Sequence, residues 1–202
     1  MTKEESKVTM SRFPVHSIET APAGSREGLQ AARARFGFVP NLLGMLAGSP
    51  AALGAYLGVT EAFGAGTLTE VERQVVLLTV SHQHECHYCM AAHSAGATMA
   101  GIAPEVLEAL RRGDPLPDAR LEALRRTTDR LVASRGWITQ EETGAFLAAG
   151  FIEAQLLEVI AGIALKTISN YANHLAGTPL DAPFAKFAWK KPEPAAAGQP
   201  VR

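Results

Sequence analysis

Residues 67–94 read TLTEVERQVVLLTVSHQHECHYCMAAHS, and this stretch decides the fold class. Thr69 with Glu72 three residues later fits a capping box, in which two side chains bond the free backbone N–H groups at a helix start. The apolar run behind them predicts a buried helix that ends at about His84. A cysteine pair then opens a second helix, which we expect to end near Gly101.

The rest of the chain also has the composition and periodicity of helices. Ala, Leu, Glu and Arg dominate, and no long alternating run of β-branched residues predicts a strand. Capping residues, prolines and glycines mark the helix ends. The expected helices run from Ser25 to about Phe36, Asn41 to Ala47, Ser49 to Phe63, Pro104 to Arg112, Asp118 to Ser134, Thr139 to Ala148 and about Glu153 to Leu175. The predicted fold class is all-α.

We divide the chain into three parts by composition and motifs. Residues 1–24 form an N-terminal extension, residues 25–178 a single all-α domain, and residues 179–202 a C-terminal tail. The domain has a cysteine-bearing half at about 37–101 and a degenerate second half at about 118–178. Because the tail is rich in proline and alanine, we expect it to lie on the surface or to be disordered.

A weak internal repeat relates the two halves. A shift of 81 residues lays Val71–Gly96 over Ile152–Gly177 with six identities in 26 positions, a level that chance in an alanine-rich helical chain could also produce. Both segments end in His-x-Ala-Gly. If the repeat is a duplication, its second copy carries Thr167 and Asn170 where the first carries cysteines, so only the first copy can perform thiol chemistry.

Charge and hydropathy exclude several classes of protein. The chain has 19 Lys and Arg against 20 Asp and Glu in 202 residues, and 47% of it is hydrophobic. That apolar fraction is too high for a disordered chain, and the balanced charge argues against a nucleic-acid partner or a polybasic membrane anchor. No apolar run reaches the roughly 20 residues that cross a bilayer, and the start of the chain has no secretory pattern. We expect a cytoplasmic protein with no membrane partner.

Cys86 and Cys89 are the two cysteines of the chain. A disulfide between them would close a loop of only a few residues, so it would add little to the stability of the fold. In a helix that begins near Cys86, Cys89 and His93 follow at i+3 and i+7 and share one face. The helix start favours a thiolate, His93 can accept or relay a proton, and a second thiol can convert a sulfenic acid into a disulfide.

A metal site is the competing interpretation of the same residues. Cys86, Cys89 and His93 would supply three ligands, and His82 or His84 would supply a fourth. Their spacing is not that of a zinc finger or ribbon. We therefore favour the redox interpretation and expect neither a metal nor a cofactor.

The motif TLTEVERQVVLL at 67–78 is followed by ECxYCxxAHS at 85–94, and FGFVPNL at 36–42 and NHLAGTPLD at 173–181 flank them. Together these motifs resemble the carboxymuconolactone decarboxylase/alkylhydroperoxidase D (AhpD-like) superfamily, in particular its peroxidase-related branch. The resemblance implies an AhpD-like all-α fold, a homo-oligomer, and a redox-active CxxC pair that reduces peroxides with thiols as the electron donor.

The resemblance also implies roles for the site residues. Cys89 matches the cysteine that passes through sulfenic acid, Cys86 its proton donor and disulfide partner, and His93 the family's histidine. Physical reasoning from the helix dipole alone favours the first cysteine as nucleophile, whereas the helical neighbour of His93 is Cys89. Gln74 occupies the position of the family's proton-relay glutamate, twelve residues before Cys86, and an amide cannot act as a base.

The candidate relay residues are therefore Gln74 itself and two nearby carboxylates. Glu72 lies two residues before Gln74 and Glu85 adjoins the first cysteine. Either carboxylate could substitute for the family's glutamate, or water with His93 could suffice.

These observations predict a thiol-dependent oxidoreductase that reduces hydroperoxides or a partner disulfide. Its partners would be that substrate and a thiol electron donor, either a protein or a small molecule. The chain is also rich in Ala and Gly, and such small residues allow helices of different subunits to pack closely in a homo-oligomer. The alternatives are a non-catalytic redox-sensing or metal-binding helical module and a carboxymuconolactone-decarboxylase-type enzyme.

Overall fold

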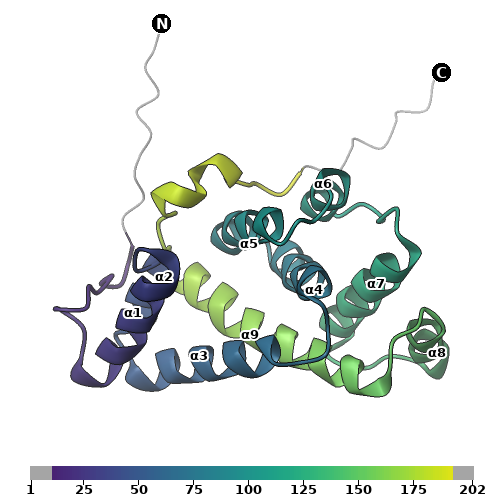
Figure 1. Cartoon of the computed structure of the whole chain (residues 1–202), viewed down its shortest axis with the longest axis horizontal. Helices are drawn as coiled ribbons and strands as arrows, with labels where there is room; N and C mark the ends of the chain where they lie inside the picture. The colour runs from purple at the N-terminus through teal and green to yellow at the C-terminus, as the bar shows by residue number, and fades with distance from the viewer. Residues whose placement is uncertain (1–10, 193–202) are drawn as a thin grey trace, which may run out of the picture.

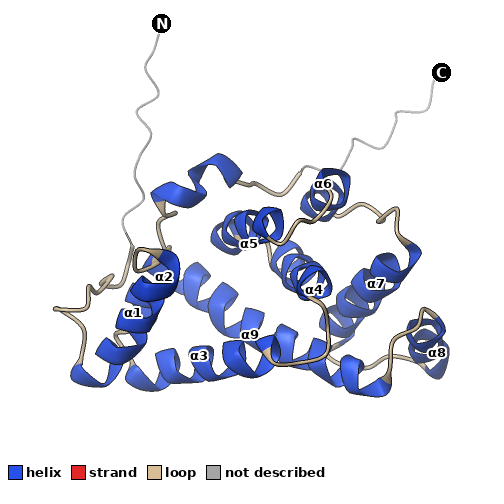
Figure 2. Ribbon diagram, in the orientation of Figure 1, coloured by secondary structure: helices blue, strands red, loops and turns tan. Residues whose placement is uncertain are grey.

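The computed structural model describes residues 11–192, and every regular element in that range is a helix (Figures 1 and 2). The remaining residues, 1–10 of the N-terminal extension and 193–202 of the tail, lie outside the described part. The elements are α1 (Ala23–Phe36), α2 (Asn41–Leu46), α3 (Pro50–Gly64), α4 (Glu70–Gln83), α5 (His87–Met99), α6 (Pro104–Arg112), α7 (Ala119–Ser134), α8 (Gln140–Ala148), α9 (Glu153–Ala176) and a short 3-10 helix, η1 (Ala182–Phe187).

The all-α prediction is confirmed, and the expected helix boundaries agree with the observed ones to within a few residues. The capping box forms at the start of α4, where Glu72 N donates to Thr69 Oγ1 at 3.2 Å and Thr69 N donates to Glu72 Oε2 at 2.8 Å. Ser49 Oγ accepts a bond from Ala52 N at the start of α3. Local side-chain chemistry thus fixes where these helices begin.

Helix α4 forms the centre of the molecule. It contacts α5, α6, α7 and α9, and its residues Val75, Val76 and Leu78 have no exposed surface. In Figure 1, α4 and α5 lie between the N-terminal helices α1 to α3 and the helices α6 to α8, while the long helix α9 extends from one group to the other. One buried cluster surrounds α4, and a second packs α1, α2 and α3 against the two cysteines.

The turn between α4 and α5 determines where the cysteine pair lies. Glu85 N donates to His82 O and Cys86 N donates to Ser81 O, both at 3.0 Å, which are the paired bonds of a Schellman motif. Glu85 takes the left-handed position of that motif, with φ of 57°. Cys86 follows directly as the N-cap of α5, so the turn that ends one helix places this cysteine at the start of the next.

The two segments aligned by the 81-residue shift fold differently. Val71–Gly96 forms α4, a turn and α5, whereas Ile152–Gly177 forms the single helix α9. The first segment changes direction at Glu85, and the matching residue, Lys166, lies inside an unbroken helix. The shift therefore does not superimpose equivalent structural units.

Residues 179–192, the described part of the tail, pack against the domain more tightly than their composition predicts. Trp189 is 7% exposed and its Nε1 donates to Arg111 O at 2.7 Å. The Asp181 carboxylate accepts bonds from the hydroxyl of Tyr88 and from Asn41 N at the start of α2. Figure 1 shows the resulting segment, in yellow, lying over one end of α5. The contacts of Trp189 and Asp181 therefore hold this proline-containing segment against the domain.

Within residues 11–192, no single helix is long and apolar enough to cross a membrane. Helices α8 and α9 together pass that test on length and composition, but they bend by 107° at the break between them.

Gly162 allows the close approach of α9 to the buried cluster around α4. A Cβ at this position would lie 2.7 Å from Val76 Cγ1 and 3.0 Å from Phe63 Cζ, and both of those side chains are buried. We expect Gly162→Ala to lower the free energy of unfolding by about 1–3 kcal/mol, because the core must shift to admit the methyl group.

Gly144→Ala in α8 is the matched control, since nothing lies within 4 Å of a Cβ there. It should raise the free energy of unfolding by about 0.5–1 kcal/mol through the better helix propensity of alanine. Urea unfolding curves measure both changes. If both substitutions change the free energy of unfolding in the same direction, the close packing assigned to Gly162 is wrong.

Candidate active site

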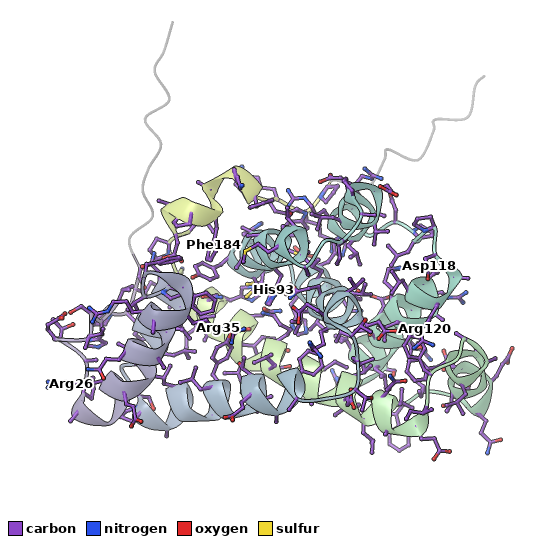
Figure 3. The ribbon with its side chains drawn as sticks, in the orientation of Figure 1. Arg26, Arg35, His93, Asp118, Arg120 and Phe184 are labelled. Carbon is purple, nitrogen blue, oxygen red and sulfur yellow. The ribbon has the colours of Figure 1, made fainter. Side chains whose placement is uncertain are left out.

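The two cysteines are free thiols buried where α5 meets α9 and the N-terminal helices. Cys86 and Cys89 are each 1% exposed, the first at the N-cap of α5 and the second in its first turn. Figure 3 labels His93 in the middle of the molecule, further along the same helix. The structure thus brings the three residues of the CxxC-and-histidine motif into one interior region.

Helix α9 presents a matching face to this region. Lys166, Ser169 and Asn173 lie at i, i+3 and i+7 on α9, the same spacing as the three motif residues on α5. Lys166 Nζ lies 2.9 Å from His93 Nε2. Ser169 Oγ and Asn173 Nδ2 lie 3.8 Å and 3.3 Å from Cys89 Sγ. Each polar residue of the α9 face therefore contacts a residue of the motif.

Both sulfurs share one amide donor. Asn173 Nδ2 also lies 3.8 Å from Cys86 Sγ, so one amide NH2 group, with its two N–H donors, contacts both sulfurs. The Oδ1 atom of Asn173 is buried without a hydrogen-bond partner among the described residues. The amide is thus oriented by the sulfurs, which is the expected orientation if one of them carries negative charge.

The two thiols differ in acidity. Burial by itself raises the pKa of Cys89, but the hydrogen bond from Cys86, the positive charge of Lys166 and the contact with Ser169 outweigh it and hold that pKa well below its ordinary value. The pKa of Cys86 is raised, first by its hydrogen bond to Cys89 and then by burial. Within the pair, Cys89 is therefore the more acidic thiol and Cys86 the less acidic one.

Lys166 is the cation that faces this charge. It is 1% exposed, and no carboxylate among the described residues forms an ion pair with it. A buried ammonium without a counter-ion costs several kcal/mol. Lys166 is one of the causes that lower the pKa of Cys89, so a thiolate at Cys89 would supply the missing negative charge.

A chain of hydrogen bonds leads from Lys166 to the surface. The pKa of His93 is held well below its ordinary value, first by burial and then by the charge of Lys166, so its ring is neutral and Nε2 accepts the lysine bond. His93 Nδ1–H then donates to Gln74 Oε1 at 3.2 Å, and Gln74 Nε2 donates to Glu70 Oε1 at 2.9 Å. The bond from Gln74 is the first cause of the lowered pKa of Glu70, which ends the chain as an anion.

Of the three candidate relay residues, only Gln74 lies in this chain. Glu72 accepts the capping bond from Thr69 N and a 2.9 Å bond from Arg120 Nε, which Figure 3 labels on α7. Glu85 forms a 2.7 Å ion pair with Lys191 Nζ on the surface. Both carboxylates therefore have structural partners away from the sulfurs.

The four-ligand metal set considered from the sequence is not brought together. His82 packs its ring against Trp189, with 5.6 Å between centroids, and His84 Nδ1 accepts a bond from Asn170 Nδ2 at 3.1 Å. Neither histidine joins the cysteines. Within residues 11–192, no group of three or more His, Cys, Asp and Glu side chains is placed to hold a metal ion.

Reasoning from the sequence missed four residues of the site: Glu70, Lys166, Ser169 and Asn173. One signal was available in the sequence. Lys166 is the single Lys or Arg of α9, and it lies on the same side of that helix as Gly162 and Leu165. A cation on an apolar helix face is unusual and points to a buried anion. The identity of that anion depends on which helix packs opposite.

The ion pair predicts a coupling between two stability changes. Cys89→Ser removes the anion and leaves Lys166 buried and unpaired, so we expect the free energy of unfolding to fall by about 3 kcal/mol. Lys166→Met added to Cys89→Ser should recover most of that loss. Chemical denaturation under reducing conditions at pH 8 measures all members of the cycle.

Cys86→Ser is the matched control, because this thiol is protonated in the pair. Its effect should be about 1 kcal/mol, and it should add to that of Lys166→Met without coupling. Additive effects of Cys89→Ser and Lys166→Met would show that the two residues do not form a pair.

Comparison with known proteins supports the architecture described above. Residues 47–127 match the model of the Carboxymuconolactone decarboxylase family. No protein of curated function matches the sequence. The matched segment begins just before α3 and extends into α7, so it contains α4, α5 and both cysteines.

Several solved structures have the same fold. A protein of Ralstonia eutropha JMP134, described as an alkylhydroperoxidase AhpD core and an uncharacterized peroxidase-related protein, matches with a TM-score of 0.78 and 23% identity over 87% of this chain and 95% of its own. An uncharacterized peroxidase-related protein of Silicibacter sp. TM1040 matches with a TM-score of 0.74 and 21% identity over 91% and 97%. The debrominase Bmp8, solved with 2,3,4-tribromopyrrole, matches with a TM-score of 0.72 and 16% identity over the same shares.

These similarities extend over most of the chain and agree with the helices and their order. The chain therefore has the AhpD-like all-α fold, and its residues 47–127 are similar to the carboxymuconolactone decarboxylase family.

Proposed function

We propose that this chain is a thiol-dependent oxidoreductase of the alkylhydroperoxidase type, which reduces a hydroperoxide through Cys86 and Cys89. The observation that carries the proposal is a reduced, buried dithiol in which Cys89 faces the cation of Lys166. A stabilised thiolate beside a protonated thiol supplies both a nucleophile and a resolving group. A partner disulfide is the other substrate class that the same pair can reduce.

The proposed cycle balances over two steps. Cys89 Sγ attacks one oxygen of the hydroperoxide ROOH; the S–O bond forms as the O–O bond breaks, and the departing alkoxide takes a proton and leaves as ROH. Cys86 loses its thiol proton and attacks Cys89 Sγ, and the displaced hydroxide leaves as water after protonation. The two thiols are oxidised to a disulfide by two electrons, and an external thiol donor reduces that disulfide.

The contacts around the sulfurs support these roles. Cys86 occupies the N-cap and Cys89 the first turn of the same helix, and Asn173 Nδ2 contacts both sulfurs, so the attacking and resolving atoms are held together. The hydrogen bond from Cys86 favours the thiolate on Cys89. The assignment of Cys89 as nucleophile therefore has two physical causes, the hydrogen bond from Cys86 and then the α9 residues Lys166 and Ser169, which oppose the preference of the helix dipole for the first cysteine.

Gln74 has an orienting role in this proposal. Its Oε1 accepts the Nδ1–H of His93, which leaves Nε2 as the acceptor that faces Lys166. A glutamate at this position could accept a proton, whereas the glutamine fixes the tautomer of the ring and links it to Glu70. The relay then ends at a carboxylate one helical turn before the position that the family uses.

A reducing compartment such as the cytoplasm would regenerate this dithiol between turnovers, and we propose that location. Redox sensing without turnover and carboxymuconolactone-decarboxylase-type chemistry remain alternatives. The first would give a disulfide that no thiol donor recycles. The second would proceed in a variant that lacks both thiols.

The test is oxidation of the reduced protein, followed by intact mass. We expect one equivalent of an organic hydroperoxide to convert wild type to the intramolecular disulfide, because Cys86 resolves the sulfenic acid formed on Cys89. Cys86→Ser should stop at a sulfenic acid that a 1,3-dione probe traps. Cys89→Ser should react at least about 100-fold more slowly, since its remaining thiol has a raised pKa.

Two further substrates extend the same assay. A small disulfide tests the second substrate class, and 2,3,4-tribromopyrrole tests the ligand held by the debrominase of the same fold. Oxidation of Cys89→Ser by hydroperoxide at the rate of wild type would overturn the proposal.

We also propose that α9 forms an interface between copies of this chain. Four large apolar side chains on this helix are mostly exposed: Leu157 (72%), Ile160 (43%), Tyr171 (57%) and Leu175 (63%). With Ala164 and Ile168 between them, they recur every three or four residues and form one stripe along the helix. Such a stripe is the pattern of a helix that packs against another helix.

Light scattering measures the mass in solution. We expect wild type to be a homo-oligomer and Leu157→Lys combined with Leu175→Lys to shift it to the monomer, because two charges would enter an apolar interface. Met99→Lys is the control: Met99 is 88% exposed on α5 and lies away from the stripe. A wild-type mass that equals one chain at all concentrations would contradict this proposal.

A further inference from the structure

We propose that Lys166 is the acid that protonates the oxygen leaving the peroxide, in addition to being the counter-ion of the Cys89 thiolate. This inference rests on the proposed function and adds a catalytic group to it. It assigns the proton step to α9, outside the CxxC motif and outside the position of the family's relay glutamate.

The burial of Lys166 is the first observation. Its side chain is closed off from solvent at 1% exposure, on the face of α9 whose next two turns contact Cys89 through Ser169 and Asn173. An ammonium in such a place needs an anion, and among the described residues the anion that faces it is a thiolate. When that thiolate becomes a neutral sulfenic acid, the charge of Lys166 loses its partner. Giving its proton to the departing oxygen then removes a buried charge that has no partner.

The fixed position of the ammonium is the second observation. Its Nζ donates to His93 Nε2 at 2.9 Å, and the ring of His93 is held in turn by Gln74 and Glu70. An ammonium has three N–H donors, and this bond uses one of them. The others are available to the region beside Cys89. The hydrogen-bond chain thus sets where the proton donor lies.

The other titratable groups near Lys166 and Cys89 are poorer acids for this step. His93 from α5 is neutral, and its one N–H is committed to Gln74. His84, at the end of α4, has a pKa lowered first by burial and accepts a bond from Asn170. Burial therefore disfavours the protonated form of both rings.

Tyr56 from α3 also has a proton to give, while the proton of the Cys86 thiol is used in the step that forms the disulfide. Burial raises the pKa of this phenol, and a phenol that gives up its proton becomes a second buried anion beside the sulfur. Lys166 instead becomes a neutral amine, which removes a charge that has lost its partner. The cation is therefore the favoured donor of the two.

The proton balance closes with the lysine included. The ammonium of Lys166 gives one proton to the alkoxide, which leaves as ROH, and becomes a neutral amine. The thiol proton of Cys86 then passes to the departing hydroxide as Cys86 attacks Cys89, and the hydroxide leaves as water. The products are ROH, water, the disulfide and neutral Lys166, which takes up a proton again when a thiol donor reduces the disulfide.

Two reactions of one thiol separate the two roles of Lys166. Alkylation by iodoacetamide requires the thiolate alone, because iodide leaves without a proton. Reduction of an organic hydroperoxide requires the thiolate and an acid. In the Cys86→Ser background only Cys89 reacts. Both rate constants are proportional to the fraction of Cys89 thiolate, so this fraction cancels when the rate constant for hydroperoxide reduction is divided by that for alkylation at the same pH. The ratio therefore measures the contribution of the acid.

Lys166→Met keeps the length of the side chain and removes its charge. We expect the midpoint of the alkylation pH profile to rise by about 1–3 pH units, because the counter-ion is lost. The hydroperoxide-to-alkylation ratio should fall by about 100-fold, because the acid is lost. Lys186→Met, on the 3-10 helix η1, is the matched control and should change neither quantity. Thermal melts followed by circular dichroism check that each variant folds.

Lys166→Arg provides an independent readout. Arginine keeps a positive charge but does not give up a proton near neutral pH. Its alkylation midpoint should therefore stay close to that of the parent protein, while the ratio should fall as it does in Lys166→Met. An unchanged ratio in either variant would overturn the acid role, as would an unmoved midpoint in Lys166→Met.

Failure of the proposed function would look different. If the parent protein is alkylated with a low midpoint that Lys166→Met raises, yet no hydroperoxide oxidises it, then the peroxidase proposal is wrong and the acid role falls with it. The ion pair would still stand, and Lys166 would be only the counter-ion of the thiolate.

Discussion

The buried pair of Lys166 and Cys89 is the interaction on which the site depends. Each partner is 1% exposed, so neither charge can be solvated by water. The lysine needs an anion and the thiolate needs a cation, and the packing of α5 against α9 brings them together. The hydrogen bond from Cys86 and then the charge of Lys166 lower the pKa of the second cysteine of the motif.

The fold supports this pair from both sides. On α5, the Schellman turn at Glu85 sets Cys86 at the N-cap, and the helix then places Cys89 and His93 one and two turns later. On α9, the spacing of three and four residues places Lys166, Ser169 and Asn173 along the opposite face. Helix α4 lies against both helices and contributes Gln74, so the core of the domain and the site share one scaffold.

Gln74 stands where the resemblance implies a relay glutamate, and this amide has a structural consequence that extends to other residues. An amide cannot carry a proton as a carboxylate does, but it can hold a neutral histidine in one tautomer and pass the contact on to Glu70. A neutral His93 accepts a bond from Lys166.

The sequence by itself determined the helices, because caps, prolines and apolar periodicity act within a few residues of each helix end. It also determined that Cys86, Cys89 and His93 share a face, since i, i+3 and i+7 spacing follows from helix geometry alone. It could not determine that Glu72 would also accept a bond from Arg120, or that Glu85 would face Lys191, because those partners are distant in the chain. Only the tertiary structure decided which side chains face the sulfurs, because α9 follows α5 by more than fifty residues and the identity of the buried counter-ion depends on how those two helices pack.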